Sequence, residues 1–222
     1  MPKRALIEHR PWLLASVAFS ILYYLIADRP LGEVFVLPGL YEIVLKGSGV
    51  MLLALYAFRR APGLDGALIG VALALSACAD MALEIELLVG GAFFAMSHAV
   101  AIYVYLRNRR ERVTISQSLF AIAIFIVTPA MTWLLSERVE VAVYSLFLGG
   151  MAAMAWTSRF PRYRVGIGAV MFVVSDWLIF SEMGSFNLGE LPRLLVWPLY
   201  YSGQLMIATG VVQTLRGERT PR

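Results

Sequence analysis

Eight long apolar runs constrain this chain more than any other feature of its sequence. Each run has about the 17 to 25 residues that an α-helix needs to cross the hydrocarbon core of a bilayer. Runs such as LLASVAFSILYYLIA and GALIGVALALSACA do not alternate apolar and polar residues, as the strands of a membrane barrel would. The sequence therefore predicts membrane-spanning helices over residues 11–27, 38–58, 65–88, 90–106, 115–135, 139–157, 165–183 and 193–214.

The composition agrees with a membrane protein and excludes several other classes. Hydrophobic residues make up 59% of the 222 residues and charged residues 15%, whereas soluble domains have roughly 45–50% and about 25%. Cys78 is the single cysteine, so the chain cannot form an internal disulfide. The connections between the runs are short. We therefore expect one all-α integral membrane domain over residues 1–222, an eight-helix bundle.

The positive charges alternate from one side of the predicted bundle to the other. Of the 19 lysines and arginines, 15 fall in the two termini and in every second connection, while Arg29, Arg138 and Arg193 fall on the opposite side. The positive-inside rule then places both termini in the cytoplasm. The excess of basic over acidic residues follows from this topology, so it gives no reason to expect a nucleic-acid partner. The expected partners are membrane lipids. A bacterial inner membrane suits this pattern.

Several polar residues fall inside the apolar runs, where they are costly and usually serve a function. With about 1.5 Å of rise per residue, five of them come out roughly 10–12 Å from the non-cytoplasmic ends of their spans. A sixth is shallower and a seventh deeper. The sequence thus predicts one buried polar cavity in the non-cytoplasmic half, lined by Lys46, Asp80, His98, Tyr200 and Asp176, with Tyr144 and Gln204.

Some of these residues also have a structural interpretation. Glu42 and Lys46 are four residues apart, so they could neutralise each other on one helix face. Glu84 lies near a span end, where water would solvate it, and His98 could be a hydrogen-bonded packing residue. Tyr200 and Tyr201 are adjacent in sequence, so they cannot both face one cavity.

The two intramembrane aspartates are harder to explain as packing residues. Asp80 lies in SACADMA and Asp176 in FVVSDWL, with no cation one turn away in either segment. Hydrogen bonding within the bundle remains the alternative to a catalytic role. The chain has no phosphate-binding loop and neither of the motifs GxSxG and HExxH, and two histidines with one cysteine cannot form the usual zinc site.

The segments around these aspartates resemble the YhhN-type family of membrane lysoplasmalogenases. SACADMALE followed by GGAFFAMSHAVAIYVYL is similar to the family pattern around Asp80 and His98. GAVMFVVSDWLIF followed by LVWPLYYSGQLMIATG is similar to the pattern through Asp176, Tyr200 or Tyr201, and Gln204. Lys46 and Tyr144 match a lysine and a tyrosine of the family. Ala79 and Gly47 depart from its usual residues, a change of backbone shape rather than chemistry.

The resemblance implies hydrolysis of the vinyl-ether bond of a lysoplasmalogen to a fatty aldehyde and a glycerophospho-alcohol, without a metal or organic cofactor. Such a bond is cleaved by protonation of its double bond, and two carboxylates that share a site cannot easily both be ionised, so one keeps its proton. We expect one of Asp80 and Asp176 to be the acid and the other to stabilise the cation. The residues that would bind the substrate, or orient water and the carboxylates, are Lys46, His98, Tyr144, Tyr200 and Gln204.

Other functions fit the same residues. A proton-coupled transporter would also use buried acids, a lysine and a histidine, but the apolar cytoplasmic half of the spans argues against a path through the bundle. A scaffold protein would leave two buried aspartates without a purpose. Within the enzymes, cleavage of an ester-linked lysolipid would indicate a lysophospholipase.

Overall fold

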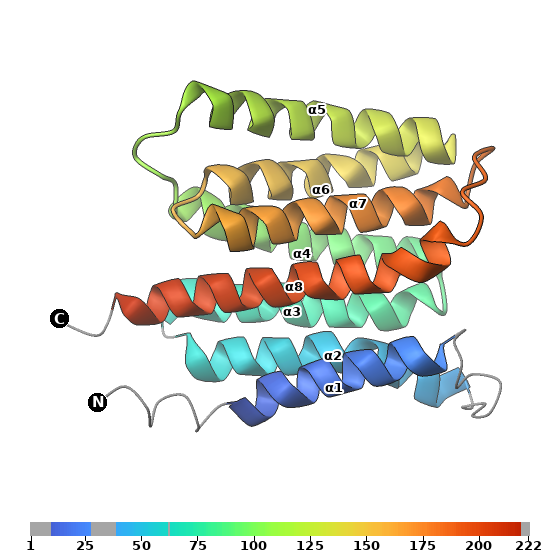
Figure 1. Cartoon of the computed structure of the whole chain (residues 1–222), viewed down its shortest axis with the longest axis horizontal. Helices are drawn as coiled ribbons and strands as arrows, with labels where there is room; N and C mark the ends of the chain where they lie inside the picture. The colour runs from blue at the N-terminus through green and yellow to red at the C-terminus, as the bar shows by residue number, and fades with distance from the viewer. Residues whose placement is uncertain (1–9, 28–38, 62, 219–222) are drawn as a thin grey trace. The chain divides into compact units, whose positions relative to one another are not determined.

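The computed structural model describes residues 10–27, 39–61 and 63–218, which form α-helices and no strand. Short connections join the helices in chain order, and a π-helical turn, η2 (Arg162–Gly166), leads into the seventh (Figure 1). The helices are α1 (Arg10–Ile26), α2 (Gly39–Arg60), α3 (Gly63–Leu83), α4 (Leu87–Arg107), α5 (Ile115–Ser136), α6 (Val139–Thr157), α7 (Ile167–Ser181) and α8 (Leu191–Gly217).

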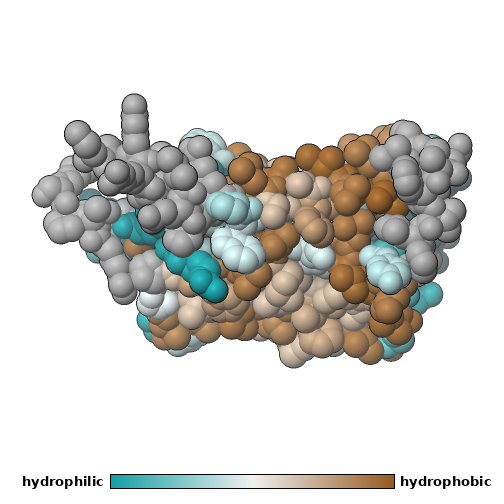
Figure 2. Space-filling view, turned by 90° about the horizontal axis from the view of Figure 1, so that it is seen from below, coloured by the Kyte–Doolittle hydropathy of each residue, from teal (hydrophilic) through white to brown (hydrophobic). Residues whose placement is uncertain are grey.

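The predicted spans correspond to these eight helices. By length and composition, six of the segments are long and apolar enough to cross a membrane: α2 to α6, and η2 together with α7. The helix α1 is a shorter apolar helix, and α8 is long enough but carries polar residues and Pro198 within its apolar run. Figure 2 shows hydrophobic residues over much of the face that it presents, as expected for a protein in contact with lipid tails.

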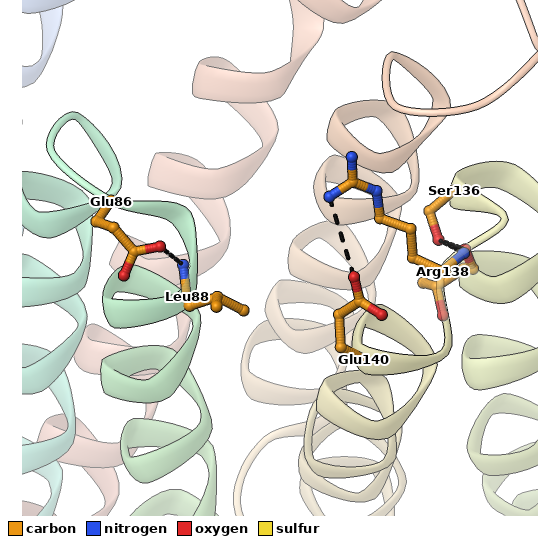
Figure 3. A network of polar contacts seen from close by, with 6 residues as sticks. Glu86, Leu88, Ser136, Arg138 and Glu140 are labelled. Atoms are coloured by element: carbon orange, nitrogen blue, oxygen red, sulfur yellow. Dashed lines mark hydrogen bonds and ion pairs between the residues drawn. The ribbon is translucent and has the colours of Figure 1, made fainter.

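One predicted boundary is wrong. The third span was expected to continue to residue 88, but α3 ends at Leu83 and α4 begins at Leu87. The carboxylate of Glu86 accepts a hydrogen bond from the backbone N–H group of Leu88 at 3.1 Å (Figure 3) and another from that of Val89 at 3.2 Å. This side chain therefore caps the new helix, a local event that the continuous apolar run does not reveal.

The chain divides into two compact units. The first contains the described residues of Met1–Ser97 and Leu215–Arg222, and the second contains His98–Thr214. The prediction of one domain stays a prediction. In the first unit, α2 packs against α1 and α3 (Figure 1). Small residues allow this approach: Ser16 Oγ donates to Gly49 O at 2.5 Å.

In the second unit, α5 packs along α6, and α7 contacts both of them. Gly149 permits a close approach of α6 to α5, since a Cβ there would lie 3.1 Å from Thr128 Cβ. A cluster formed by Leu135, Val141 and Phe180 joins the three helices near one end.

The helices α7 and α8 meet at two glycines. A Cβ on Gly168 would lie 2.7 Å from Gly203 O, and a Cβ on Gly203 would lie 2.6 Å from Gly168 O. Real Cβ atoms do not approach a carbonyl oxygen this closely, so only glycine allows this contact. It fixes the spacing of the two helices that carry Asp176 and Gln204.

Candidate active site

Asp176 lies in the core of the second unit, 5% exposed. It projects from α7 toward α6, where Tyr144 Oη donates a hydrogen bond to Asp176 Oδ2 at 2.7 Å. Ser175 Oγ is 3.5 Å from Asp176 Oδ1 and donates to the Phe172 carbonyl at 2.8 Å. A buried carboxylate needs such partners because burial removes its water.

His98 extends this arrangement from α4. Its Nε2 lies 3.1 Å from Tyr144 Oη, and the side chain is 1% exposed. A phenol has one hydrogen, so when Tyr144 donates it to Asp176 it must accept from His98, and Nε2 then carries the hydrogen. His98, Tyr144 and Asp176 thus form a continuous hydrogen-bonded series across three helices, which we call the polar chain.

Aromatic rings hold the polar chain in place. The Phe172 ring is edge-on to His98 at 5.0 Å and edge-on to Tyr200 at 4.9 Å, measured between ring centroids. Tyr201 stacks on Trp197 instead, at 6.4 Å. Of the two adjacent tyrosines, Tyr200 is therefore the one that shares a ring neighbour with His98.

Gln204 completes the set of predicted residues in the second unit. It is 4% exposed and follows Tyr200 by one turn on α8, so the two residues share a helix face. Both are buried. The close contact between Gly168 and Gly203 holds α8, which carries both residues, against α7.

The other two predicted residues belong to the first unit. Asp80 is 2% exposed on α3. Lys46, on α2, forms an ion pair with Glu84, which lies one turn beyond Asp80, and its Nζ is 6.0 Å from the centroid of the Tyr23 ring. Among the described residues, the ion-pair partner of Lys46 is Glu84, rather than the Glu42 that the sequence offered.

The pairing of Asp80 with Asp176 stays a prediction, because the two residues belong to different units. The sequence missed Phe172 and the partner role of Glu84. Phe172 precedes Asp176 by four residues, the spacing of one helix face, but an apolar residue in an apolar run carries no further signal. Within the described ranges, no group of three or more His, Cys, Asp or Glu residues could hold a metal ion.

Comparison with known proteins assigns the chain to a family. Proteins named lysoplasmalogenase from Mycobacterium bovis and Mycobacterium tuberculosis are each 26% identical to the chain over 211 residues, covering 88% of this chain and 80% of the relative. No solved structure matches the chain. The family model described as YhhN matches residues 41–211, which include the polar chain, Lys46 and Asp80. The chain belongs to the YhhN family.

Proposed function

We propose that the chain is an integral membrane lysoplasmalogenase, which hydrolyses the vinyl-ether bond of a lysophospholipid. The observation that carries this proposal is the buried polar chain on Asp176, within a region matched by the family model. The relatives named lysoplasmalogenase supply the reaction class. The products would be a fatty aldehyde and a glycerophospho-alcohol.

The reaction requires an acid and an anion in a site with little water. A carboxylic acid adds a proton to the double-bond carbon further from the ether oxygen, and the other carbon becomes part of an oxocarbenium ion. Water then adds to that carbon and returns a proton to the carboxylate. The hemiacetal breaks the bond between that carbon and the glycerol oxygen, and its hydroxyl proton passes to the glycerol oxygen as the aldehyde is released. The proton balance closes, so the acid is regenerated. Glycoside hydrolases use two carboxylates for a similar cation.

The polar chain suits a carboxyl group that gains and loses a proton. With Asp176 ionised, hydrogen bonds run from His98 to Tyr144 and on to Asp176. With Asp176 protonated on Oδ2, the carboxylic acid can donate to Tyr144, whose hydroxyl then donates to His98 Nε2. This second state requires His98 to lose its hydrogen from Nε2 and to gain one on Nδ1, which is a change of neutral tautomer. The heavy atoms need not move, so both protonation states keep their hydrogen bonds.

The remaining predicted residues receive supporting roles in this proposal. Asp80 is the second carboxylate, and either aspartate can be the acid. Lys46, which forms an ion pair with Glu84 near the end of α3, would bind the phosphate of the head group. Tyr200 and Gln204 would orient water or substrate from one face of α8. The apolar tail of the substrate would lie among the spans, and the site would open to the non-cytoplasmic side.

The test uses purified protein in detergent without added cofactor. We would supply a lysoplasmalogen and, separately, its ester-linked analogue, and follow aldehyde and fatty-acid release by mass spectrometry. We expect aldehyde from the vinyl ether alone. Asp176→Asn and Asp80→Asn should each abolish release while the protein still inserts. Asp65→Asn, the same chemical change in the first turn of α3, should leave the rate unchanged.

Each result has a defined meaning. Full activity of Asp176→Asn or Asp80→Asn would disprove the aspartate-pair mechanism. Fatty acid from the ester analogue would indicate a lysophospholipase. No product from either lipid would refute the proposed function and favour the transporter.

A further inference from the structure

Seven arginines gather at one end of the second unit, in segments that contain none of the candidate site residues. They come from two segments, residues 107–114 between α4 and α5 and residues 158–166 between α6 and α7. The two segments contain a single carboxylate, that of Glu111. We call this group the arginine cluster: Arg107, Arg109, Arg110, Arg112, Arg159, Arg162 and Arg164.

Hydrogen bonds tie the two segments to each other. Arg159 N donates to Asn108 O at 2.8 Å, and Arg159 Nε donates to Asn108 Oδ1 at 2.7 Å. Arg110 N donates to Thr157 O at 3.3 Å. Asn108 is 3% exposed, so it fastens the segments from inside. These hydrogen bonds keep the two segments, and therefore their arginines, next to each other.

The contacts that hold three of these arginines neutralise no charge. Arg110 Nη2 donates to Phe160 O at 3.5 Å. Arg164 Nη1 donates to the amide oxygen of Gln213, on α8. The amide of Gln117 faces the Arg162 guanidinium, and its oxygen, once turned toward it, accepts at 2.6 and 3.2 Å. These acceptors orient the guanidinium groups, and they leave each with its positive charge.

Arg162 also keeps one unused donor. Its Nε is buried and has no hydrogen-bond acceptor among the described residues. Buried donors are nearly always paired in native proteins, so an unpaired one calls for an acceptor. A phosphate oxygen would supply both the acceptor and the negative charge.

Two arginines elsewhere in the second unit make the contrast clear. Arg138 lies 4.0 Å from Glu140 (Figure 3), and Arg193 lies 3.2 Å from Glu190. Each of these two arginines forms an ion pair with a carboxylate. The arginine cluster has one carboxylate within its own two segments for seven arginines, and the contacts of Arg110, Arg162 and Arg164 described above are to neutral oxygen atoms. A negatively charged ligand would therefore complement these three guanidinium groups.

Aromatic rings accompany the arginine cluster. The Arg162 guanidinium lies 5.7 Å from the centroid of the Trp156 ring, which in turn lies 4.3 Å from the Phe120 ring. Tyr163, between Arg162 and Arg164, is 77% exposed. Aromatic and basic side chains together at the end of apolar helices are typical of the level of lipid head groups. This placement favours a lipid phosphate over a soluble anion.

We infer that the arginine cluster is a binding site for the phosphate of an anionic phospholipid. The guanidinium groups bind the phosphodiester oxygens, Trp156 and Tyr163 contact the glycerol region, and the acyl chains lie along the apolar ends of the neighbouring helices. This site is separate from the polar chain and requires no catalysis, so it stands or falls independently of the proposed function.

The experiment measures lipid binding by the full chain in a neutral detergent. Phosphatidylglycerol or phosphatidylcholine is titrated into the micelles, and the thermal unfolding temperature and the lipid adducts in native mass spectrometry are recorded. We expect saturable binding and a higher unfolding temperature with phosphatidylglycerol only. Inorganic phosphate at equal concentration should have no such effect.

Matched variants locate the site. Arg109→Gln with Arg112→Gln removes two exposed charges from the arginine cluster and should weaken phosphatidylglycerol binding by about 30-fold. Arg162→Gln should weaken it as well, since it removes the guanidinium with the unused donor. Arg138→Gln with Arg193→Gln removes two charges from the same unit outside the cluster and should leave binding unchanged.

Three results would overturn the inference. They are equal binding of phosphatidylcholine, equal losses in the control pair and the cluster pair, and a full response to inorganic phosphate alone. The Arg109 and Arg112 side chains are exposed, so their replacement does not disturb packing and a loss of binding there cannot come from misfolding.

Discussion

At the scale of single residues, Tyr144 connects the other two members of the polar chain. Its hydroxyl lies between Asp176 Oδ2 and His98 Nε2, and its ring packs edge-on against Phe180, 5.9 Å between centroids. The ring contact and the hydroxyl contacts can therefore be separated by a single substitution. The hydroxyl is the part that bears on proton transfer.

Tyr144→Phe should slow turnover without unfolding the protein. The ring remains against Phe180, whereas Asp176 loses its donor at 2.7 Å. We expect kcat to fall about 100-fold, the lower end of what a positioned proton-transfer group contributes, with KM nearly unchanged. Aldehyde release measures the rate, and thermal unfolding checks the fold. Tyr103→Phe, at a half-exposed tyrosine, is the control, and an unaltered kcat in Tyr144→Phe would refute the role.

The ion pair of Lys46 with Glu84 should contribute measurably to stability. The side chains are 17% and 38% exposed, so solvent screens the pair only in part. A double-mutant cycle with Lys46→Met and Glu84→Gln should give a coupling of about 0.5–1 kcal/mol in the free energy of unfolding. The same cycle on Arg138 and Glu140, both more than half exposed at 4.0 Å, should give about zero. Equal couplings would mean that the two pairs are solvated alike.

How much of the site the sequence could predict follows from residue type. His98, Tyr144 and Asp176 are polar residues in apolar runs. Counting helical rise places His98 and Asp176 in one layer and Tyr144 somewhat nearer the non-cytoplasmic end, and the structure brings the three together. The ring centroid of Phe172 lies 5.0 Å from that of His98, nearer than the Tyr144 centroid at 5.8 Å, yet nothing in the sequence distinguishes Phe172 from other apolar residues of its helix. Apolar residues that contribute only packing contacts to a site cannot be recognised from a single sequence.

At the scale of elements, the contact between α7 and α8 fixes the frame of the site. It depends on Gly168 and Gly203, whose backbones approach too closely for a side chain. The helix α7 carries Asp176, and α8 carries Tyr200 and Gln204. A change in the spacing of these helices would therefore alter the site without any change in its own residues.

Gly168→Ala should both destabilise the protein and lower its activity. The added Cβ would lie 2.7 Å from Gly203 O, a backbone atom that cannot rotate away, so we expect a loss of about 1–3 kcal/mol in the free energy of unfolding. Gly91→Ala in α4 is the control, because a Cβ there meets nothing within 4 Å. Unfolding in detergent and aldehyde release measure the two effects. Equal stability of the two variants would contradict the close contact.

The ends of the elements were the least predictable part of the fold. Apolar runs gave each helix within a few residues, because hydropathy is averaged over a whole span. The end of α3 depends instead on Glu86, one side chain that caps the next helix. Likewise, the π-helical turn before α7 is a matter of local backbone geometry, which no hydropathy pattern encodes.

At the scale of the whole molecule, the alternating charges predict on which side of the membrane each connection lies. Segment 107–114 should face the cytoplasm and segment 182–190 the opposite side. In a Cys78→Ala background, a membrane-impermeant maleimide should label Ser185→Cys in intact cells. It should label Arg109→Cys only after the membrane is opened. Both positions are exposed. The reverse pattern would invert the topology, and labelling of both in intact cells would contradict an odd number of spans between them.

The composition of α8 bears on how the protein enters the membrane. Its 27 residues include Pro198, and its buried side chains include Tyr200 and Gln204. Because of these residues, transfer of α8 from the translocation channel into lipid is less favourable than transfer of the more apolar helices. The close contact of Gly203 with Gly168 can form only once α7 is in place. We therefore expect α8 to enter the lipid as a partner of α7, which precedes it in the order of synthesis, so that Tyr200 and Gln204 would join the polar chain only after α7 is in place.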